Sequence, residues 1–291
     1  MIFTLKNTFL TATFSAHGAE LLTLEDAKGR SYLMRDPRFW GYSAPHLFPV
    51  VGMQNKGQIF IDGTSYPMKR HGFARHLPFT VVRQDDTSIT FLLTDSPETT
   101  SIFPYAFNLF VHYTLLANTL KVTYEIANPK DCVLPFSIGA HPAFWTLMED
   151  AQNFEDFYLV FEKEEHLETI PIDLETGLLK RGVLPLGEHI QKLPLKKTLF
   201  QQDALIFHNL RSSYVSLKNT KNPQEIRFHF QEFPFLGIWT PLEDAPFVCL
   251  EPWAGHADYE DFQGSFEDKE DNILLAPKET KTFSYAMEIL P

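Results

Sequence analysis

The chain has few of the features that mark secreted or membrane proteins. Its 291 residues include only two cysteines, Cys132 and Cys249, which we expect to be buried thiols in a reducing compartment rather than a disulfide framework. No stretch approaches the roughly 18 apolar residues of a membrane span, and the N-terminus lacks a basic segment followed by a long apolar core. We therefore expect a cytoplasmic protein with no membrane partner.

Positive charge is also scarce. The 25 lysines and arginines are outnumbered by 37 aspartates and glutamates, which gives a formal net charge of −12 at pH 7. Such a field repels polyanions, so neither nucleic acid nor an anionic membrane surface is expected as a partner. A strongly anionic substrate is disfavoured for the same reason, unless a local cationic pocket overrides the global field.

Long helical patterns are missing as well. No segment keeps a 3.6-residue hydrophobic period over three turns, and only Glu162–Leu167 and Trp145–Asp156 are candidates for short helices. The chain is instead rich in phenylalanine, with 27 copies, and has 20 prolines against 14 glycines. This composition is typical of many short strands and turns.

Strand patterns occur from one end of the chain to the other. Apolar and polar residues alternate over Leu120–Ile126, Glu225–Phe230 and Phe283–Ile289, and Ile59–Tyr66 predicts a hairpin with an Asp-Gly turn at its centre. No repeat, low-complexity tract or linker interrupts this pattern. We therefore expect an all-β fold, a large antiparallel β-sandwich with few short helices, in which residues 1–291 form a single domain.

Two short motifs far apart in the chain carry the strongest chemical signal. GAHPAFW puts His141 directly before a proline, and LEPWAG puts Glu251 before another proline at the end of an apolar run. A His-Pro step favours a strand end that can face a cleft, and a carboxylate after an apolar run is expected to be partly desolvated. The two are candidates for a general acid–base pair. The alternatives are a hydrogen-bonded histidine at a strand end and a glutamate paired with a nearby cation.

Further polar and aromatic candidates lie elsewhere in the chain. Residues 70–75 (RHGFAR) contain His71, which could donate to a sugar hydroxyl, and Arg75, which could do the same or brace the site; a turn with solvated charges is the alternative. Asp203 enters an apolar strand and could accept hydrogen bonds from sugar hydroxyls or cap a turn. Trp239 and Trp253 could stack on a sugar ring or belong to the core.

Metal, nucleotide and hydrolase motifs are not found. The eleven histidines form no HxH, HxxxH or HExxH pair, and neither cysteine has a second cysteine nearby. GxSxG, Walker and GxGxxG motifs are also missing. We expect neither a metal nor a cofactor; a metal-dependent isomerase is an alternative that metal analysis of the purified protein would test.

Taken in order, these motifs resemble one known family. HGFAR, GAHPAFW, DALIF (beginning at Asp203) and LEPWAG, together with PHLFPVVG at residues 45–52, are similar to the aldose 1-epimerase (galactose mutarotase) superfamily over nearly the whole chain, and most of all to its bacterial LacX-like branch. The resemblance implies a galactose mutarotase-like supersandwich with a sugar in an open cleft. It also implies His141 as general acid, Glu251 as general base, and His71 and Asp203 as substrate-binding residues.

The activity that the resemblance implies is a cofactor-independent isomerisation. An aldose 1-epimerase interconverts the α and β anomers of a hexose by opening and closing the ring, here as a monomer or homodimer. The chain departs from the family at Met53, where galactose mutarotases place a sugar-binding arginine after the glycine that matches Gly52. Arg70 or Arg75 could supply that cation. We favour a neutral aldose as substrate, and the alternatives are a hexose-6-phosphate 1-epimerase and a non-catalytic sugar-binding or sensing protein on the same fold.

Overall fold

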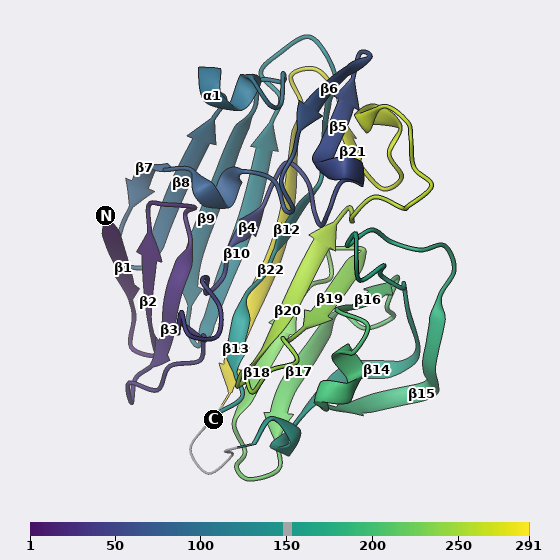
Figure 1. Cartoon of the computed structure of the whole chain (residues 1–291). Coiled ribbons are helices and arrows are strands. Elements are labelled where there is room, and N and C mark those ends of the chain that lie inside the picture. Colours follow the sequence, from purple (N-terminus) through teal and green to yellow (C-terminus); the bar gives the residue numbers. More distant parts are fainter. Residues whose placement is uncertain (148–152, 291) are drawn as a thin grey trace.

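The largest part of the fold is a nine-stranded antiparallel sheet (Figure 1). The computed structural model describes residues 1–147 and 153–290. The strand order in this sheet is β15-β14-β17-β18-β22-β10-β9-β8-β7. Its strands are β7 (Thr80–Gln84), β8 (Ser88–Thr94), β9 (Asn108–Leu116), β10 (Thr119–Ala127), β14 (Phe157–Thr169), β15 (Leu184–Pro194), β17 (Tyr214–Asn219), β18 (Glu225–His229) and β22 (Thr280–Leu290).

A second, six-stranded sheet packs against the first. Its order is β16-β19-β20-β12-β4, and β13 pairs with β20 beside this path. In Figure 1 strands β16, β19 and β20 lie in front of the larger sheet, and aromatic contacts such as Phe161–Phe207 and Phe144–Phe228 join the two layers. Its strands are β4 (His46–Leu47), β12 (Ile138–Ala140), β13 (Ala143–Trp145), β16 (Leu205–His208), β19 (Phe235–Trp239) and β20 (Phe247–Ala254).

Smaller elements complete the fold at its edges. Three further sheets join β1 (Ile2–Lys6), β2 (Leu10–Ser15) and β3 (Leu21–Asp26); β5 (Gln58–Ile61) and β6 (Thr64–Pro67); and β11 (Leu134–Phe136) and β21 (Ile273–Leu275). The helical elements are α1 (Pro97–Thr100) and the 3₁₀ helices Asn55–Gly57, Ala74–His76, Phe154–Asp156, Lys197–Phe200 and Phe266–Asp268. No helix within the described residues is long and apolar enough to cross a membrane.

The alternating sequence patterns correspond to strands with one buried face. In β10 the residues Leu120, Val122, Tyr124 and Ile126 are buried, while the residues between them are more exposed. The predicted hairpin is formed by β5 and β6, whose register closes at Ile61 and Thr64. The expected all-β antiparallel sandwich is therefore confirmed, whereas the assignment of residues 1–291 to one domain stays a prediction.

Three local expectations were wrong or only partly testable. Glu162–Leu167 is not a helix but the middle of β14, because strand pairing with β15, in which Glu165 and Leu167 take part, overrides the helix-favouring charged run. Trp145–Asp156 contains the end of β13 and a 3₁₀ helix, and residues 148–152 lie outside the described residues. Of the two thiols, Cys249 is buried as expected, but Cys132 is exposed.

A buried polar cluster ties the two sheets together behind the cavity described below. His46 on β4 contacts the hydroxyl of Tyr124 on β10 through Nδ1 at 2.6 Å and that of Tyr113 on β9 through Nε2 at 2.7 Å. Burial lowers the pKa of His46 to about 4, so the imidazole is neutral at physiological pH. A satisfied, uncharged cluster of this kind fixes the layers relative to one another.

Candidate active site

The six-stranded sheet buries residues on both of its faces. Successive residues of β20 point to opposite sides, so Val248 and Leu250 enter the core between the sheets, while Cys249, Glu251 and Trp253 lie on the outer face. The outer face forms the floor of an open cavity of about 550 Å³, which Glu251 and Trp253 line. Glu251, which ends the apolar run, therefore lies inside a cavity and not at a solvent-exposed end of a strand.

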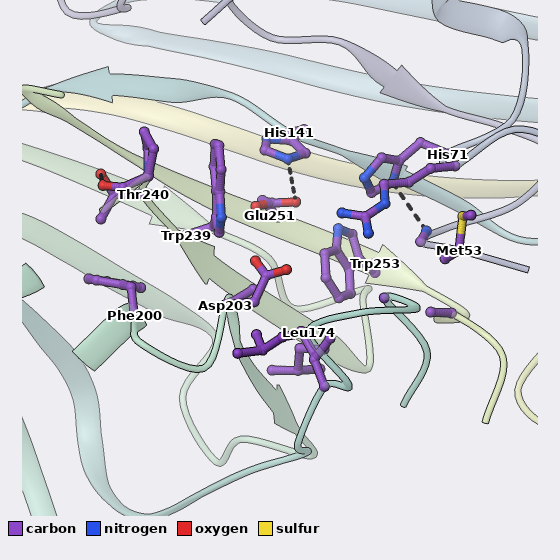
Figure 2. A pocket seen from close by; sticks show the side chains of 18 of the residues that line it. Met53, His71, His141, Leu174, Phe200, Asp203, Trp239, Thr240, Glu251 and Trp253 are labelled. Atoms are coloured by element: carbon purple, nitrogen blue, oxygen red, sulfur yellow. Dashed lines mark hydrogen bonds and ion pairs between the residues drawn. The ribbon is translucent and has the colours of Figure 1, made fainter. Parts of the chain in front are cut away.

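His141 and Glu251 meet on the floor of this cavity. His141 directly follows β12, which pairs with β20, and its backbone N–H donates to the carbonyl of Pro45 at 3.1 Å. Its Nε2 lies 3.1 Å from Oε2 of Glu251, and the two side chains are only 8% and 2% exposed (Figure 2). Residues 110 positions apart in sequence are thus in direct contact, and both side chains line the same cavity.

Burial controls the protonation of this pair. It raises the pKa of the Glu251 carboxyl well above the ordinary value, with a smaller contribution from the negative charge of Asp203. It also lowers the pKa of His141, and the positive charge of Arg75 adds to this effect. Both shifts keep the pair neutral as a whole. A second proton would give the pair a net positive charge, and loss of its only proton would give it a net negative charge, and burial disfavours either charge in a desolvated site. The pair therefore holds a single proton around neutral pH.

His71 lies next to this pair in a defined tautomer. It has a positive φ of 66°, which turns its side chain into the cavity, and its ring centroid is 5.6 Å from that of His141. The backbone N–H of Gly52 donates to Nδ1 of His71 at 3.1 Å, the contact drawn beside Met53 in Figure 2. Since Nδ1 accepts and burial lowers the pKa of this histidine well below its ordinary value, its Nε2 carries the proton and can donate to a ligand.

The remaining residues predicted from sequence also line the cavity. Asp203 lies just before β16 with a φ of 70°, and its carboxylate faces the cavity. Trp239 ends β19 and meets the ring of His141 edge-on at 5.7 Å and 80°. The guanidinium of Arg75 lies over the ring of Tyr42 at 5.0 Å and donates to the carbonyl of Arg70 at 2.9 Å. The structure thus brings all six candidate residues to one place.

Two further lining residues determine the charge at one end of the cavity. Met53 occupies the position at which galactose mutarotases have a sugar-binding arginine, and Arg70 lines the same region of the cavity. The Arg70 side chain passes directly over the backbone of Gly177, where an added Cβ would lie 2.2 Å from the guanidinium. Among the described residues it makes no ion pair or side-chain hydrogen bond. Arg70 therefore offers a cation whose hydrogen-bonding groups are available to a ligand.

A buried ion pair holds the loop that carries Met53. Lys269 Nζ lies 2.8 Å from Oδ1 of Asp258 and donates to Oε1 of Gln54 at 3.0 Å, and the other carboxylate oxygen of Asp258 accepts from the backbone N–H of Asn55 at 2.8 Å. Both charged side chains are almost fully buried. A pair that is satisfied on both sides in this way fixes the geometry of the loop that it holds.

Sequence reasoning missed several residues of the cavity. Trp40 packs on His141 at 4.7 Å with an interplanar angle of 32°, and Tyr42 lies beneath Arg75. Parts of two loops, 172–179 and 240–242, form the rim. The only sequence signal for Trp40 and Tyr42 is the aromatic cluster RFWGY at residues 38–42, and this cluster does not reveal that Trp40 packs on His141.

One group of side chains has the composition of a metal site. Ligand atoms of His141, Cys249 and Glu251 all lie within 4.8 Å of one another. Burial raises the pKa of the Cys249 thiol well above its ordinary value, as it does for the Glu251 carboxyl. A metal needs both as anions, so the desolvation that keeps them protonated opposes metal binding at this position.

Comparisons with known proteins identify close relatives. The sequence pattern of the family described as aldose 1-epimerase matches residues 1–279. The plasmid-borne protein LacX of Lactococcus lactis subsp. lactis is 32% identical over 298 residues, which cover the whole of both chains. A galactose mutarotase related enzyme from Lactobacillus acidophilus superimposes with a TM-score of 0.93 at 31% identity, over 100% of this chain and 98% of that one. A galactose mutarotase-like protein from Lactobacillus casei gives a TM-score of 0.92 at 29% identity over all of both chains.

Proposed function

The chain belongs to the aldose 1-epimerase family, and from this premise we propose that it is a mutarotase that interconverts the α and β anomers of a hexose without a cofactor. The observation that carries the proposal is the contact between Nε2 of His141 and Oε2 of Glu251, 3.1 Å apart on the floor of a cavity. Mutarotation requires proton transfer at two oxygens bonded to the same carbon. Two titratable groups in direct contact can reach both oxygens at once.

The reaction moves protons only. Glu251 removes the proton from the anomeric hydroxyl, the bond between C1 and the ring oxygen breaks, and His141 gives its proton to the ring oxygen. The open-chain aldehyde then rotates about its C1–C2 bond and closes on the other carbonyl face by the reverse steps. At rest the pair carries its single proton on Glu251, as its burial favours. Transfer of that proton to His141 across their contact gives the reactive form, and ring opening leaves His141 neutral and Glu251 protonated again, so the pair keeps one proton throughout.

The surrounding residues suit the recognition of a polyhydroxyl ligand. His71 presents an N–H donor, Asp203 presents acceptors, and the rings of Trp40 and Trp239 supply apolar walls. Sugar rings combine hydroxyl groups with apolar faces, so this mixture of donors, acceptors and aromatic surface is complementary to them. We place His141 and Glu251 as catalytic residues, and His71, Asp203, Arg75 and Trp239 as substrate-binding residues.

Polarimetry of freshly dissolved α-glucose and α-galactose tests the proposal. The protein should speed the approach to anomeric equilibrium, and His141→Asn and Glu251→Gln should each reduce that rate by roughly 100-fold or more, because one acid or base contributes about 10²–10⁴-fold. Binding of these sugars without any effect on the rate would instead support a non-catalytic sugar-binding protein.

A second candidate substrate is a hexose 6-phosphate. It is favoured by Arg70, whose guanidinium lines the cavity with no ion-pair partner in the part of the chain that the structure describes. The net charge of −12 and the carboxylate of Asp203 in the same cavity favour a neutral sugar. Comparing kcat/KM for galactose, glucose and their 6-phosphates at low and moderate salt decides between them. A preference for a 6-phosphate that weakens with salt and is lost in Arg70→Ala or Arg75→Ala would overturn the neutral-sugar proposal.

A further inference from the structure

Trp253 lies across the strands that carry the catalytic pair. Its indole covers the backbone of Gly139 on β12 and of Gly237 on β19, the two neighbours of β20. An added Cβ at Gly139 would lie 2.7 Å from Cδ1 of the indole, and one at Gly237 would lie 2.7 Å from Cζ2. Neither glycine has a positive φ, so the backbone does not require glycine at these positions. The two residues instead form a flat seat for the indole, and at Gly139 the carbonyl oxygen of Pro252, 3.0 Å from an added Cβ, also leaves no room for a side chain.

This seat fixes the direction of the indole N–H. The edge of the ring from Cδ1 through Nε1 to Cζ2 spans from Gly139 to Gly237, and Gly237 is the register partner of Glu251. Glu251 and Trp253 are two residues apart on one strand, so their side chains share a face. In Figure 2 the indole nitrogen lies on the side of the ring toward Glu251 and His71.

The N–H lies close to the Glu251 carboxyl, whose pKa it lowers, but it makes no hydrogen bond of regular geometry to any described residue, although the side chain is buried. Nε1 of Trp253 is one of the buried side-chain atoms without a hydrogen-bond acceptor, and the residue is 5% exposed. Buried tryptophans normally find an acceptor for this group. One more such atom, Nδ1 of His141, belongs to the same cavity. Two polar atoms without a regular hydrogen bond at one site favour a ligand as the source of their partners.

We propose that Nε1–H of Trp253 donates a hydrogen bond to the anomeric oxygen of the sugar, the oxygen from which Glu251 removes the proton. This inference rests on the proposed mutarotase function and adds a third group at the reacting centre. As the proton leaves, negative charge develops on that oxygen, and a fixed neutral donor stabilises it without having to reorganise. The N–H bond itself stays intact throughout the reaction.

The donor also acts on the base. The nearby indole N–H favours the ionised form of Glu251 and partly offsets the effect of burial on the pKa of its carboxyl. Loss of the N–H should therefore raise the pKa of Glu251 further and move the alkaline limb of the rate profile to higher pH. A residue that only packs against the floor of the cavity would not produce this shift.

Trp253→Phe removes the donor and keeps an aromatic ring. We expect kcat/KM for mutarotation to fall by about tenfold or more, which corresponds to the loss of one hydrogen bond that is formed in the transition state. Gly237→Ala, which pushes the indole off its seat, should lower the rate in the same direction. Trp145→Phe is the matched control, since Trp145 lies outside the cavity, and it should retain the wild-type rate.

A binding measurement tests the contact independently of turnover. The chain has four tryptophans, so a protein labelled with ¹⁵N in the indoles gives few N–H resonances, and the one missing from Trp253→Phe belongs to Trp253. That resonance should move on addition of galactose, glucose or glucose 6-phosphate, whichever the wild-type protein epimerises fastest. Wild-type activity in Trp253→Phe, or an indole resonance that saturating sugar does not move, overturns the inference. If the wild-type protein epimerises none of the three, the proposed function has failed, and the same titration with each sugar still decides whether the indole contacts it.

Discussion

Glu251→Gln should abolish anomerisation and at the same time stabilise the fold. Burial raises the pKa of the Glu251 carboxyl well above its ordinary value of 4.5. At neutral pH the folded protein therefore favours a protonated carboxyl that the unfolded chain holds ionised, and this mismatch destabilises the fold. The amide has nearly the same shape and no charge, so it avoids the penalty. It cannot accept a proton, however, and the rate should fall by roughly 100-fold or more.

The gain in stability of Glu251→Gln over the wild type should increase as the pH rises. Because the folded pKa is raised, the penalty is absent below the unfolded pKa of 4.5, grows above it, and levels off at the folded pKa. One proton changes the free energy of unfolding by about 1.4 kcal/mol per pH unit. Between pH 5 and pH 7 the stability of the variant relative to the wild type should therefore rise, by up to about 3 kcal/mol.

Urea denaturation at pH 5, 6 and 7 measures this difference, and polarimetry measures the rate. Glu188→Gln, at a position whose side chain is 74% exposed, is the control for pH effects that any lost carboxylate would produce. A stability difference that stays constant or shrinks from pH 5 to pH 7 would refute the reasoning about burial. A rate close to wild type would refute the assignment of Glu251 as the base.

Three further predictions follow from the same cavity. The profile of kcat/KM against pH should be bell-shaped, with an acid limb below pH 6.5 because burial lowers the pKa of His141, and an alkaline limb that reports the raised pKa of Glu251; His141→Asn should lose the acid limb with most of the activity, and a flat profile from pH 5 to 9 with rate-limiting chemistry would contradict the two-group mechanism. Trp40→Ala should admit water to His141 and move the acid limb to higher pH, because desolvation is the main cause of the lowered pKa; an unmoved limb would show that Trp40 does not shield the imidazole. Dialysis against a chelator should leave the rate unchanged, because the burial that raises the pKa of the Cys249 thiol and of the Glu251 carboxyl opposes metal binding between them; loss of activity that zinc restores would contradict this.

Local patterns in the sequence predicted the strands, but they did not predict which face of the six-stranded sheet carries the cavity. In β10 one side is buried and the other is not, so the alternation of apolar and polar residues is visible. In β20 every residue is buried, and a continuous apolar run does not show which side carries the cavity. The charged run at 162–167 suggested a helix because its partners in β15, Ile190 and Gly187, which decide its conformation, are distant in sequence.

Residues of the candidate site could be predicted when they lie in a short, distinctive motif. They could not be predicted when their place in the site depends on a contact between segments that are distant in sequence. His141 and Glu251 stand in distinctive motifs, and the structure brings them into contact. Trp40 packs on His141 across a separation of 101 positions, and nothing in its own neighbourhood indicates this. The arginines at 70 and 75 are equivalent by sequence, but the structure separates them, because Arg75 is held by a backbone carbonyl and by Tyr42 while Arg70 is held by neither.

The two side chains that we propose as catalytic, Glu251 and His141, lie on or directly after strands of a sheet that also forms the core. Met53, Arg70 and the rim residues at 172–179 and 240–242 are instead carried by loops. Substitutions on these loops leave the spacing of His141 and Glu251 unchanged, because strand pairing between β12 and β20 sets that spacing. An ancestral chain could therefore exchange one sugar for another through loop changes alone, without passing through an inactive intermediate. Relatives with the same strands and the same acid–base pair can then differ in the sugar that they accept, and the loops, more than the sheet, are where a change of substrate should be sought or engineered.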